Sequence, residues 1–464
     1  MEISTQELRK NIWKLAWPAT LRMAFQTSMM IITLILVGNY FLGAEAVAAI
    51  GLAQRVMFLV IGTMTALGVG TTALIAHYYG AGKTEKAGAI VSQSLIIGIA
   101  VAVILALLLD KFGGHAIALL MLGNPEPQVI AMGSNYLRVI GFSMILGIVM
   151  MIINSALQGA GDMKTPMFFT IAANILTMVL GVILIPGLGP IPALGLTGAG
   201  LAEGLARALG GVVALLFLLR GKFVVKIKTR DFLQWHSQVV KKILEIGLPA
   251  AGEQLVRQSS QILYTILIAN LGTVAIAANQ IVMTVLTTSF LPGFGFGLAA
   301  TTLVGQALGA QNPDDAERYG YETNKFAMAF MGMMGIIFFI FARSIAAIFV
   351  PEKEVIELAA SCLRLVAFAQ VPFSVIMVLS GGLRGAGDTR WVMYLTGAGQ
   401  WGIRLLLSFV LIWWFGFGLV GAWIAMLIDV LVRSILVLWR YRSGRWKDVF
   451  EIEDNKPRVR FSES

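Results

Sequence analysis

The feature that most constrains this chain is a series of apolar segments, each long enough to cross a lipid bilayer. A bilayer core of about 30 Å needs about 20 apolar residues in a helix. The expected spans are 12–40, 46–76, 88–109, 130–158, 164–186, 193–219, 243–271, 275–308, 322–349, 354–384, 390–415 and 417–440. Within them, apolar and polar residues do not alternate as they do in barrel strands. The sequence therefore predicts an all-α membrane protein with twelve transmembrane helices.

The composition supports the bilayer as the solvent and excludes several functions. The chain is 58% hydrophobic and 13% charged, whereas soluble domains carry about 25% charged residues. The net charge of +10 lies mostly in loops and tails without aromatic-basic motifs, so we expect membrane lipid and not nucleic acid as a partner. The single cysteine, Cys362, and three scattered histidines predict no disulfide framework, no metal site and no cofactor.

The distribution of basic residues predicts the orientation. Lysine and arginine gather in the segment 220–242 and in the tail after residue 440, whereas the loops on the other side hold only Lys111 and Lys353. Loops that remain in the cytoplasm carry the excess of positive charge. We therefore predict a multi-pass protein of the plasma membrane with both termini in the cytoplasm.

The sequence contains two copies of one unit, because six motifs return in the same order. The pairs are WPA (17–19) and LPA (248–250), LGAEAVAAI (42–50) and LGTVAIAAN (271–279), Gly68–Gly80 and Gly297–Gly309, YLRVIGF (136–142) and CLRLVAF (362–368), LQGAGD (157–162) and LRGAGD (383–388), and GLTGAGLA (195–202) and GLVGAWIA (418–425). The same order of motifs in both halves of the chain indicates that the sequence arose by duplication.

Each copy contains six spans, so both copies enter the membrane from the same side and are related by an axis along the membrane normal. We predict two pseudo-twofold-related six-helix bundles. The expected divisions are an N-terminal lobe at 1–219, a basic cytoplasmic linker at 220–242, a C-terminal lobe at 243–440 and a cytoplasmic tail at 441–464.

The duplicated GAGD motif resembles the GxGD pattern of intramembrane aspartyl proteases. That chemistry needs two aspartates that share a proton inside the membrane. Both copies instead follow long spans at equivalent positions, where glycine can end one helix and Asp162 or Asp388 can cap the next. We therefore expect a protein that is not an enzyme.

Charged residues inside the spans are candidates for ion coupling, because a charge in the bilayer core is costly. Glu203 and Arg207 lie four residues apart in the sixth span, and Asp429 and Arg433 repeat this spacing in the twelfth. Glu253 lies in the seventh span. Two interpretations remain open: structural ion pairs within each bundle, or carboxylates whose protonation alternates during transport.

Neutral polar, methionine and arginine side chains in the spans are candidates for a substrate cavity. Residues of this kind can also serve only as hydrogen-bonding contacts between helices. The candidates are Met23, Gln26, Asn154, Asn174, Gln254, Arg257, Gln280 and Arg404.

The whole chain resembles the multidrug and toxic compound extrusion (MATE) family. The resemblance rests on VGNYFLGAEAVAAIGLA (37–53), LQGAGDMKTP (157–166), GLGPIPALGLTGAG (187–200), PGFGFGLAATTLVGQALGA (292–310) and LRGAGDT (383–389). It implies a twelve-helix exporter with two six-helix lobes. Such proteins exchange small cationic or amphiphilic organic compounds for protons or sodium ions, and we expect a monomer.

The family's first-lobe cation site is altered in this sequence. The family has an Asp in helix one, an Asn and an Asp in helix five, and a Thr in helix six, where this chain has Thr33, Thr177, Gly181 and Glu203. Gln26 and Asn154 match polar positions that line the family's first-lobe cavity. The resemblance therefore implies that Glu203 is a relocated coupling carboxylate.

The second lobe offers an alternative coupling site. Another branch of the family uses a glutamate in helix seven, where this chain has Arg257, with Glu253 one turn earlier. The coupling-ion candidates are accordingly Glu203, Glu253, Asp429, Thr33 and Thr177.

Two functional hypotheses follow. The first is an antiporter that exports organic compounds by alternating access. The second is a flippase for a lipid or a lipid-linked saccharide, which the arginines Arg22, Arg55, Arg257 and Arg404 favour if they face the cavity, because such cargo carries phosphate.

Overall fold

The computed structural model describes residues 3–40, 44–121, 126–188, 190, 192–225, 227 and 230–449 of the chain. Every regular element in these ranges is a helix. The first six long helices are α1 (Thr5–Tyr40), α2 (Ala44–Gly80), α3 (Thr84–Leu120), α4 (Pro127–Gly159), α5 (Lys164–Leu184) and α6 (Gly195–Leu219). The short helix α7 (Arg230–Leu233) follows.

The second half repeats this order. Its helices are α8 (Ser237–Ala269), α9 (Thr273–Gly309), α10 (Pro313–Ala347), α11 (Lys353–Gly385), a continuous span made of α12 (Thr389–Gly397), the π-helix η1 (Ala398–Leu405) and α13 (Leu406–Trp413), and α14 (Gly418–Arg442). The described chain thus contains twelve long helices, which confirms the predicted fold class. The π-helix was not predicted; a glycine-rich stretch at 397–402 is its only signal in the sequence.

Ten of the twelve helices are long and apolar enough to span a membrane by their described residues alone. The other two are α1 and α8. The side chains of residues 29–40 in α1 lie outside the description, and α8 carries several charged residues, including Glu253 and Arg257. Several helices exceed the expected spans, as α3 does by continuing to Leu120, so they tilt or extend beyond the hydrocarbon core.

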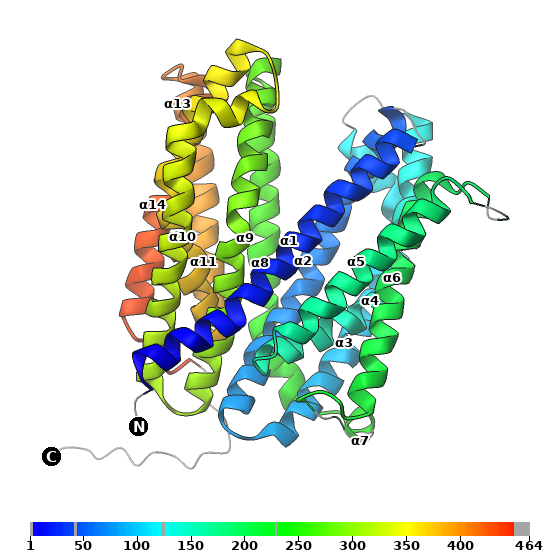
Figure 1. Cartoon of the computed structure of the whole chain (residues 1–464), viewed down its shortest axis with the longest axis vertical. Helices are drawn as coiled ribbons and strands as arrows, with labels where there is room; N and C mark the ends of the chain where they lie inside the picture. Colours follow the sequence, from blue (N-terminus) through cyan, green and yellow to red (C-terminus); the bar gives the residue numbers. More distant parts are fainter. Residues whose placement is uncertain are drawn as a thin grey trace.

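The helices form two bundles that meet at the end where α1 begins and α14 ends, and they diverge toward the other end (Figure 1). The same hydrogen bond recurs in each bundle. The Thr72 hydroxyl donates to the Ser155 carbonyl (3.0 Å), and the Thr301 hydroxyl donates to the Gly381 carbonyl (2.8 Å). These residues occupy equivalent positions in the two copies, so the duplication seen in the sequence is a duplication of structure.

Two helices cross from one bundle to the other. The first half of α1 packs against α9 and α10, where the Trp13 ring contacts Phe296 and Phe326 edge-on at centroid distances of 5.9 and 5.8 Å. Figure 1 shows α1 running diagonally across the molecule toward the far end of the other bundle. Its later part packs against α5. Leu8 and Ile12, near the start of α1, are fully buried in the same apolar core as Phe296, so the start of α1 is anchored in the C-terminal bundle.

The crossing of α8 mirrors that of α1. Ile243 and Ile246, near its start, belong to the apolar core of the N-terminal bundle, whereas Tyr264 and Ile268 belong to the core of the other. Each bundle therefore contains half a helix from the other copy, and the two bundles are joined at the end where α1 begins and α14 ends.

Candidate functional site

The C-terminal bundle holds a carboxylate between two arginines. Glu253 of α8 pairs with Arg257 one turn later (2.5 Å) and with Arg384 of α11 (2.7 Å). The Glu253 side chain is only 4% exposed, whereas those of Arg257 and Arg384 are 37% and 22% exposed. The carboxylate is thus buried, whereas the side chains of its two arginine partners are partly exposed.

A second ion pair lies deeper in the same bundle. On α14, the Arg433 guanidinium donates two hydrogen bonds to Asp429, at 2.8 and 2.7 Å. Both side chains are buried. This two-bond geometry is the strongest form of an arginine–carboxylate contact, and it favours the structural interpretation of this pair.

The third predicted cation, Arg404, lies in the π-helix. Its side chain is buried and rests over the Tyr264 ring, 4.6 Å from the centroid. It forms no ion pair among the described residues, and its Nε has no hydrogen-bond partner there. π-helical turns are frequently found at functional sites, so this buried guanidinium, which has no carboxylate partner in the described chain, is a candidate for ligand contact.

The N-terminal bundle contains one intramembrane ion pair with the predicted spacing. Glu203 and Arg207 of α6 lie 2.5 Å apart with 27% and 38% of their side chains exposed. When GLTGAGLA is aligned with GLVGAWIA, Glu203 corresponds to Met426. The pairs Glu203–Arg207 and Asp429–Arg433 therefore have the same spacing but are not equivalent positions of the repeat.

The neutral candidates of the N-terminal bundle are placed on three helices. Asn154 of α4 and Asn174 of α5 each have a buried amide atom without a partner in the described chain. Thr177 donates to the Ala173 carbonyl at 2.9 Å, which is an ordinary contact within a helix. Thr33 lies on α1, but its side chain is outside the described residues.

The remaining candidates do not gather around the charged residues. Met23 is half-buried and Gln26 is exposed on α1. Gln254 lies against Gly62 of α2 in a narrow contact between the bundles, and Gln280 is exposed on α9.

The two GAGD turns are local structural elements. Asp162 accepts hydrogen bonds from the backbone N–H (3.0 Å) and the hydroxyl (2.6 Å) of Thr165, as a helix cap does. Asp388 instead pairs with Arg440 of α14 at 2.8 Å. Burial raises the pKa of the Asp388 carboxyl above its ordinary value, and the Arg440 guanidinium opposes that rise.

The contact that closes the joined end was not predicted, although it is built from the repeated motifs. His77 Nε2 lies 2.9 Å from the Gly385 carbonyl, and the Gln306 side chain donates to the Gly159 carbonyl at 2.9 Å. His77 and Gln306 are equivalent in the two copies, as are Gly159 and Gly385. The two bundles thus exchange a reciprocal pair of hydrogen bonds across the pseudo-twofold axis.

Glycines allow the close approach that these bonds require. A side chain at Gly80 would collide with the Gln306 carbonyl, and one at Gly309 would collide with the His77 carbonyl. The alternation of small residues in Gly68–Gly80 and Gly297–Gly309 is the sequence signal that could have indicated this interface.

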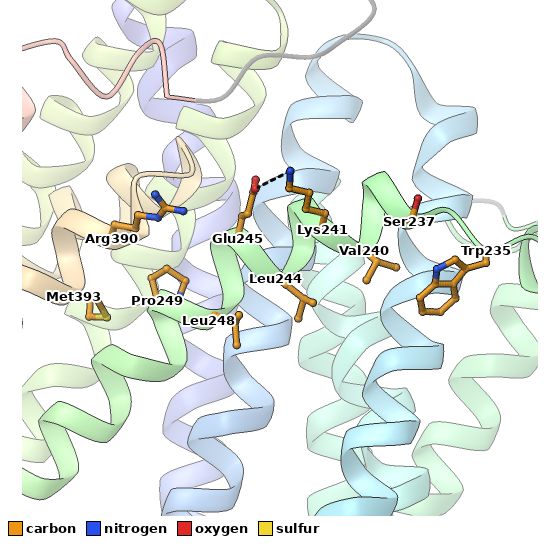
Figure 2. Close-up of a pocket in the computed structure, with 10 residues that line it drawn as sticks. All are labelled: Trp235, Ser237, Val240, Lys241, Leu244, Glu245, Leu248, Pro249, Arg390 and Met393. Atoms are coloured by element: carbon orange, nitrogen blue, oxygen red, sulfur yellow. Dashed lines mark ion pairs between the residues drawn. The ribbon is translucent and has the colours of Figure 1, made fainter.

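A groove of about 650 Å³ lies at the start of α8 and α12 (Figure 2). Its lining is Trp235, Ser237, Val240, Lys241, Leu244, Glu245, Leu248, Pro249, Arg390 and Met393. In Figure 2 it follows α8 from Trp235 to Arg390 and Met393 of α12, with Lys241 and Glu245 paired at 3.9 Å. Mostly apolar walls with a few charges suit an amphiphilic molecule.

Comparison with known proteins places the chain. The MatE family model matches residues 18–183 and 249–410. The chain is 30% identical over 447 residues to the probable multidrug resistance protein NorM of Thermotoga maritima, covering 95% of this chain and 94% of that protein. It is 26% identical over 438 residues to the uncharacterized transporter YisQ of Bacillus subtilis, covering 94% of each.

Solved structures share the fold. An outward-facing conformation of a multidrug resistance MATE family transporter superposes with a TM-score of 0.86 at 24% identity, covering 96% of this chain and 99% of that one. A MOP superfamily transporter from Pyrococcus furiosus, described as having a binding pocket of reverse polarity, gives 0.86 at 24% identity over 96% and 98%. The chain belongs to the MatE family, and it is a multi-pass membrane transporter and not an enzyme.

Proposed function

We propose that this protein is a secondary antiporter that exports amphiphilic organic compounds across the plasma membrane in exchange for protons or sodium ions. The observation that carries the proposal is the reciprocal contact of His77 with Gly385 and of Gln306 with Gly159. Two bundles joined at one end by a few weak bonds can rock between two arrangements. Relatives named as probable multidrug resistance proteins support efflux of organic compounds.

The orientation proposed from the basic residues makes the joined end cytoplasmic. The bundles diverge toward the opposite end, so this conformation corresponds to an outward-facing state. In the inward-facing state, the two reciprocal hydrogen bonds are broken and the bundles close at the external end. The groove beside Pro249 lies at the proposed cytoplasmic end, where an amphiphilic substrate arrives from the inner leaflet.

We place the coupling step at Glu203. Arg207 holds its carboxylate, and both charged side chains are partly exposed, so water and a cation can reach the pair. A proton that binds Glu203 neutralises the carboxylate and releases Arg207. The contacts between α6 and α4 then differ between the two protonation states, which is what coupling requires.

Glu203→Gln removes the ionisable group but keeps the size of the side chain. In proteoliposomes with an imposed proton or sodium gradient, we expect gradient-driven uptake of an amphiphilic probe to fall at least about tenfold. Equilibrium exchange of the probe without a gradient should persist, because the substrate path is intact. Full gradient-driven uptake in the variant would move the coupling site to Glu253 or Asp429.

A flippase for a lipid-linked saccharide is the second candidate function. The partly exposed Arg257 and Arg384 favour it, since such cargo carries phosphate. A flippase would move a headgroup-labelled lipid between leaflets without any ion gradient, which distinguishes it from the antiporter.

A further inference from the structure

We propose that the C-terminal bundle binds an anionic group of the transported compound, a carboxylate, sulfonate or phosphate, between Arg257 and Arg384. The inference rests on the proposed transport function and specifies its substrate class. It follows from the balance of charge, the arrangement of the guanidinium groups and the unpaired donors in this bundle.

The charged side chains around Glu253 and Asp429 in the C-terminal bundle carry a net positive charge. The arginine cluster consists of four guanidinium groups and two carboxylates, those of Arg257, Arg384, Arg404, Arg433, Glu253 and Asp429. Among the described residues, no other carboxylate pairs with any of these arginines. Four positive and two negative charges leave an excess of two positive charges inside a membrane protein, where unpaired charge is costly. An anionic ligand compensates this excess.

Glu253 holds the two arginines from its buried position. Both Glu253 oxygens are engaged, with Arg384 Nη2 at 2.7 and 2.9 Å and Arg257 Nη2 at 2.5 Å. The carboxylate therefore fixes the two guanidinium groups from the buried side. The Arg257 and Arg384 side chains are 37% and 22% exposed, so both remain accessible while they hold the buried carboxylate. Two oriented arginines match the oxygens of a carboxylate or phosphate.

Unused donors remain in the site. A guanidinium carries five N–H groups, and Arg257 uses one of them on Glu253. Its Nε is buried and has no partner within the described chain, and the same is true of Arg404 Nε. Arg257 is also close enough to Arg384 and Arg433 for electrostatic repulsion, as is Arg433 to Arg404. A bound anion satisfies the free donors and screens this repulsion.

The excess of positive charge in the arginine cluster disfavours binding of a cation in the C-terminal bundle. A cationic group would enter a site that already has two excess positive charges. The intramembrane ion pair of the N-terminal bundle, Glu203 and Arg207, is neutral overall. The protein therefore separates its tasks: the N-terminal bundle exchanges the coupling ion, and the C-terminal bundle holds the anionic end of the cargo.

The test measures binding of two radiolabelled amphiphiles of opposite charge to the purified full-length protein. Taurocholate is the anion and tetraphenylphosphonium the cation. We expect taurocholate to bind the wild type at least about tenfold more tightly than tetraphenylphosphonium. Arg257→Gln should raise the taurocholate Kd about tenfold, because it removes one charge-assisted contact and leaves Glu253 paired with Arg384.

Two further variants separate binding from damage to the fold. Glu253→Gln raises the net positive charge and keeps an amide oxygen that can still accept hydrogen bonds from the two arginines. It should therefore lower the taurocholate Kd, whereas a purely structural role predicts weaker binding. Arg343→Gln is the matched control, since Arg343 pairs with Glu357 (2.9 Å) outside the cluster and both are exposed. It should bind taurocholate as the wild type does.

Transport in proteoliposomes separates the two proposals. Gradient-driven uptake of tetraphenylphosphonium without binding or uptake of taurocholate would overturn the anion site and leave the antiporter standing. Absence of uptake of both compounds would overturn the antiporter, and taurocholate binding would still report the site.

Vesicles with phosphatidylglycerol, compared with vesicles of phosphatidylcholine alone, identify the source of the anion. If phosphatidylglycerol competes with taurocholate, the site binds a lipid headgroup. If it does not compete, the site binds a dissolved organic anion.

Discussion

A disulfide between α2 and α9 is expected to stop transport reversibly. The pair is Ala76→Cys with Gly305→Cys, in a Cys362→Ser background. A Cβ placed at Gly305 would lie 2.8 Å from the Ala76 Cβ, so the two helices need to separate only slightly to reach disulfide geometry. Oxidation should fix the joined end shut and lower uptake at least about tenfold, because alternating access requires this end to open.

Uptake should return after reduction, which excludes damage to the fold as the cause. Each single cysteine variant, treated with the same oxidant, should transport as it does untreated. Undiminished uptake by fully cross-linked protein, with cross-linking measured by thiol labelling, would contradict opening at this interface.

Loss of one member of the buried pair on α14 is expected to destabilise the protein severely. Asp429→Asn leaves the Arg433 charge buried without a partner, which costs about 3–5 kcal/mol. Such a loss is a large fraction of the stability of a typical domain, about 5–15 kcal/mol. We expect a thermal unfolding midpoint many degrees below that of the wild type in the same detergent.

Removing both charges should restore most of this stability. Asp429→Asn combined with Arg433→Met removes both charges of the pair, so neither is left buried without its partner, and it roughly keeps the side-chain volume. If the single variant unfolds at the wild-type temperature but has lost ion-driven uptake, the pair is a coupling site and not a structural one.

Much of the fold could be predicted from the sequence because the bilayer leaves few choices. Apolar length identifies the spans, and backbone hydrogen bonding in lipid requires helices. The exchange of α1 and α8 between bundles could not be predicted, since it depends on contacts such as Trp13 with Phe296 and Phe326, far apart in the sequence. The π-helix likewise has no periodicity that distinguishes it from an ordinary span.

The candidate site was predictable where the partners are close in sequence. The spacing of four residues indicated the pairs Glu203–Arg207 and Asp429–Arg433, and both form. The second partner of Glu253, Arg384, comes from another helix, and no local pattern indicates it. Its one signal is the difference between LQGAGD and LRGAGD, where Arg384 replaces the equivalent Gln158. Because of this difference, Glu253 is held between Arg257 and Arg384, and the site is positively charged overall.

The most direct test of the account is uptake of labelled taurocholate by proteoliposomes that contain the wild-type protein, with and without an imposed ion gradient. An antiporter should accumulate the compound above its equilibrium level only when a proton or sodium gradient of opposite direction is present, and an ionophore that dissipates the gradient should abolish the accumulation. Equal uptake with and without the gradient, unaffected by the ionophore, would contradict ion-coupled export.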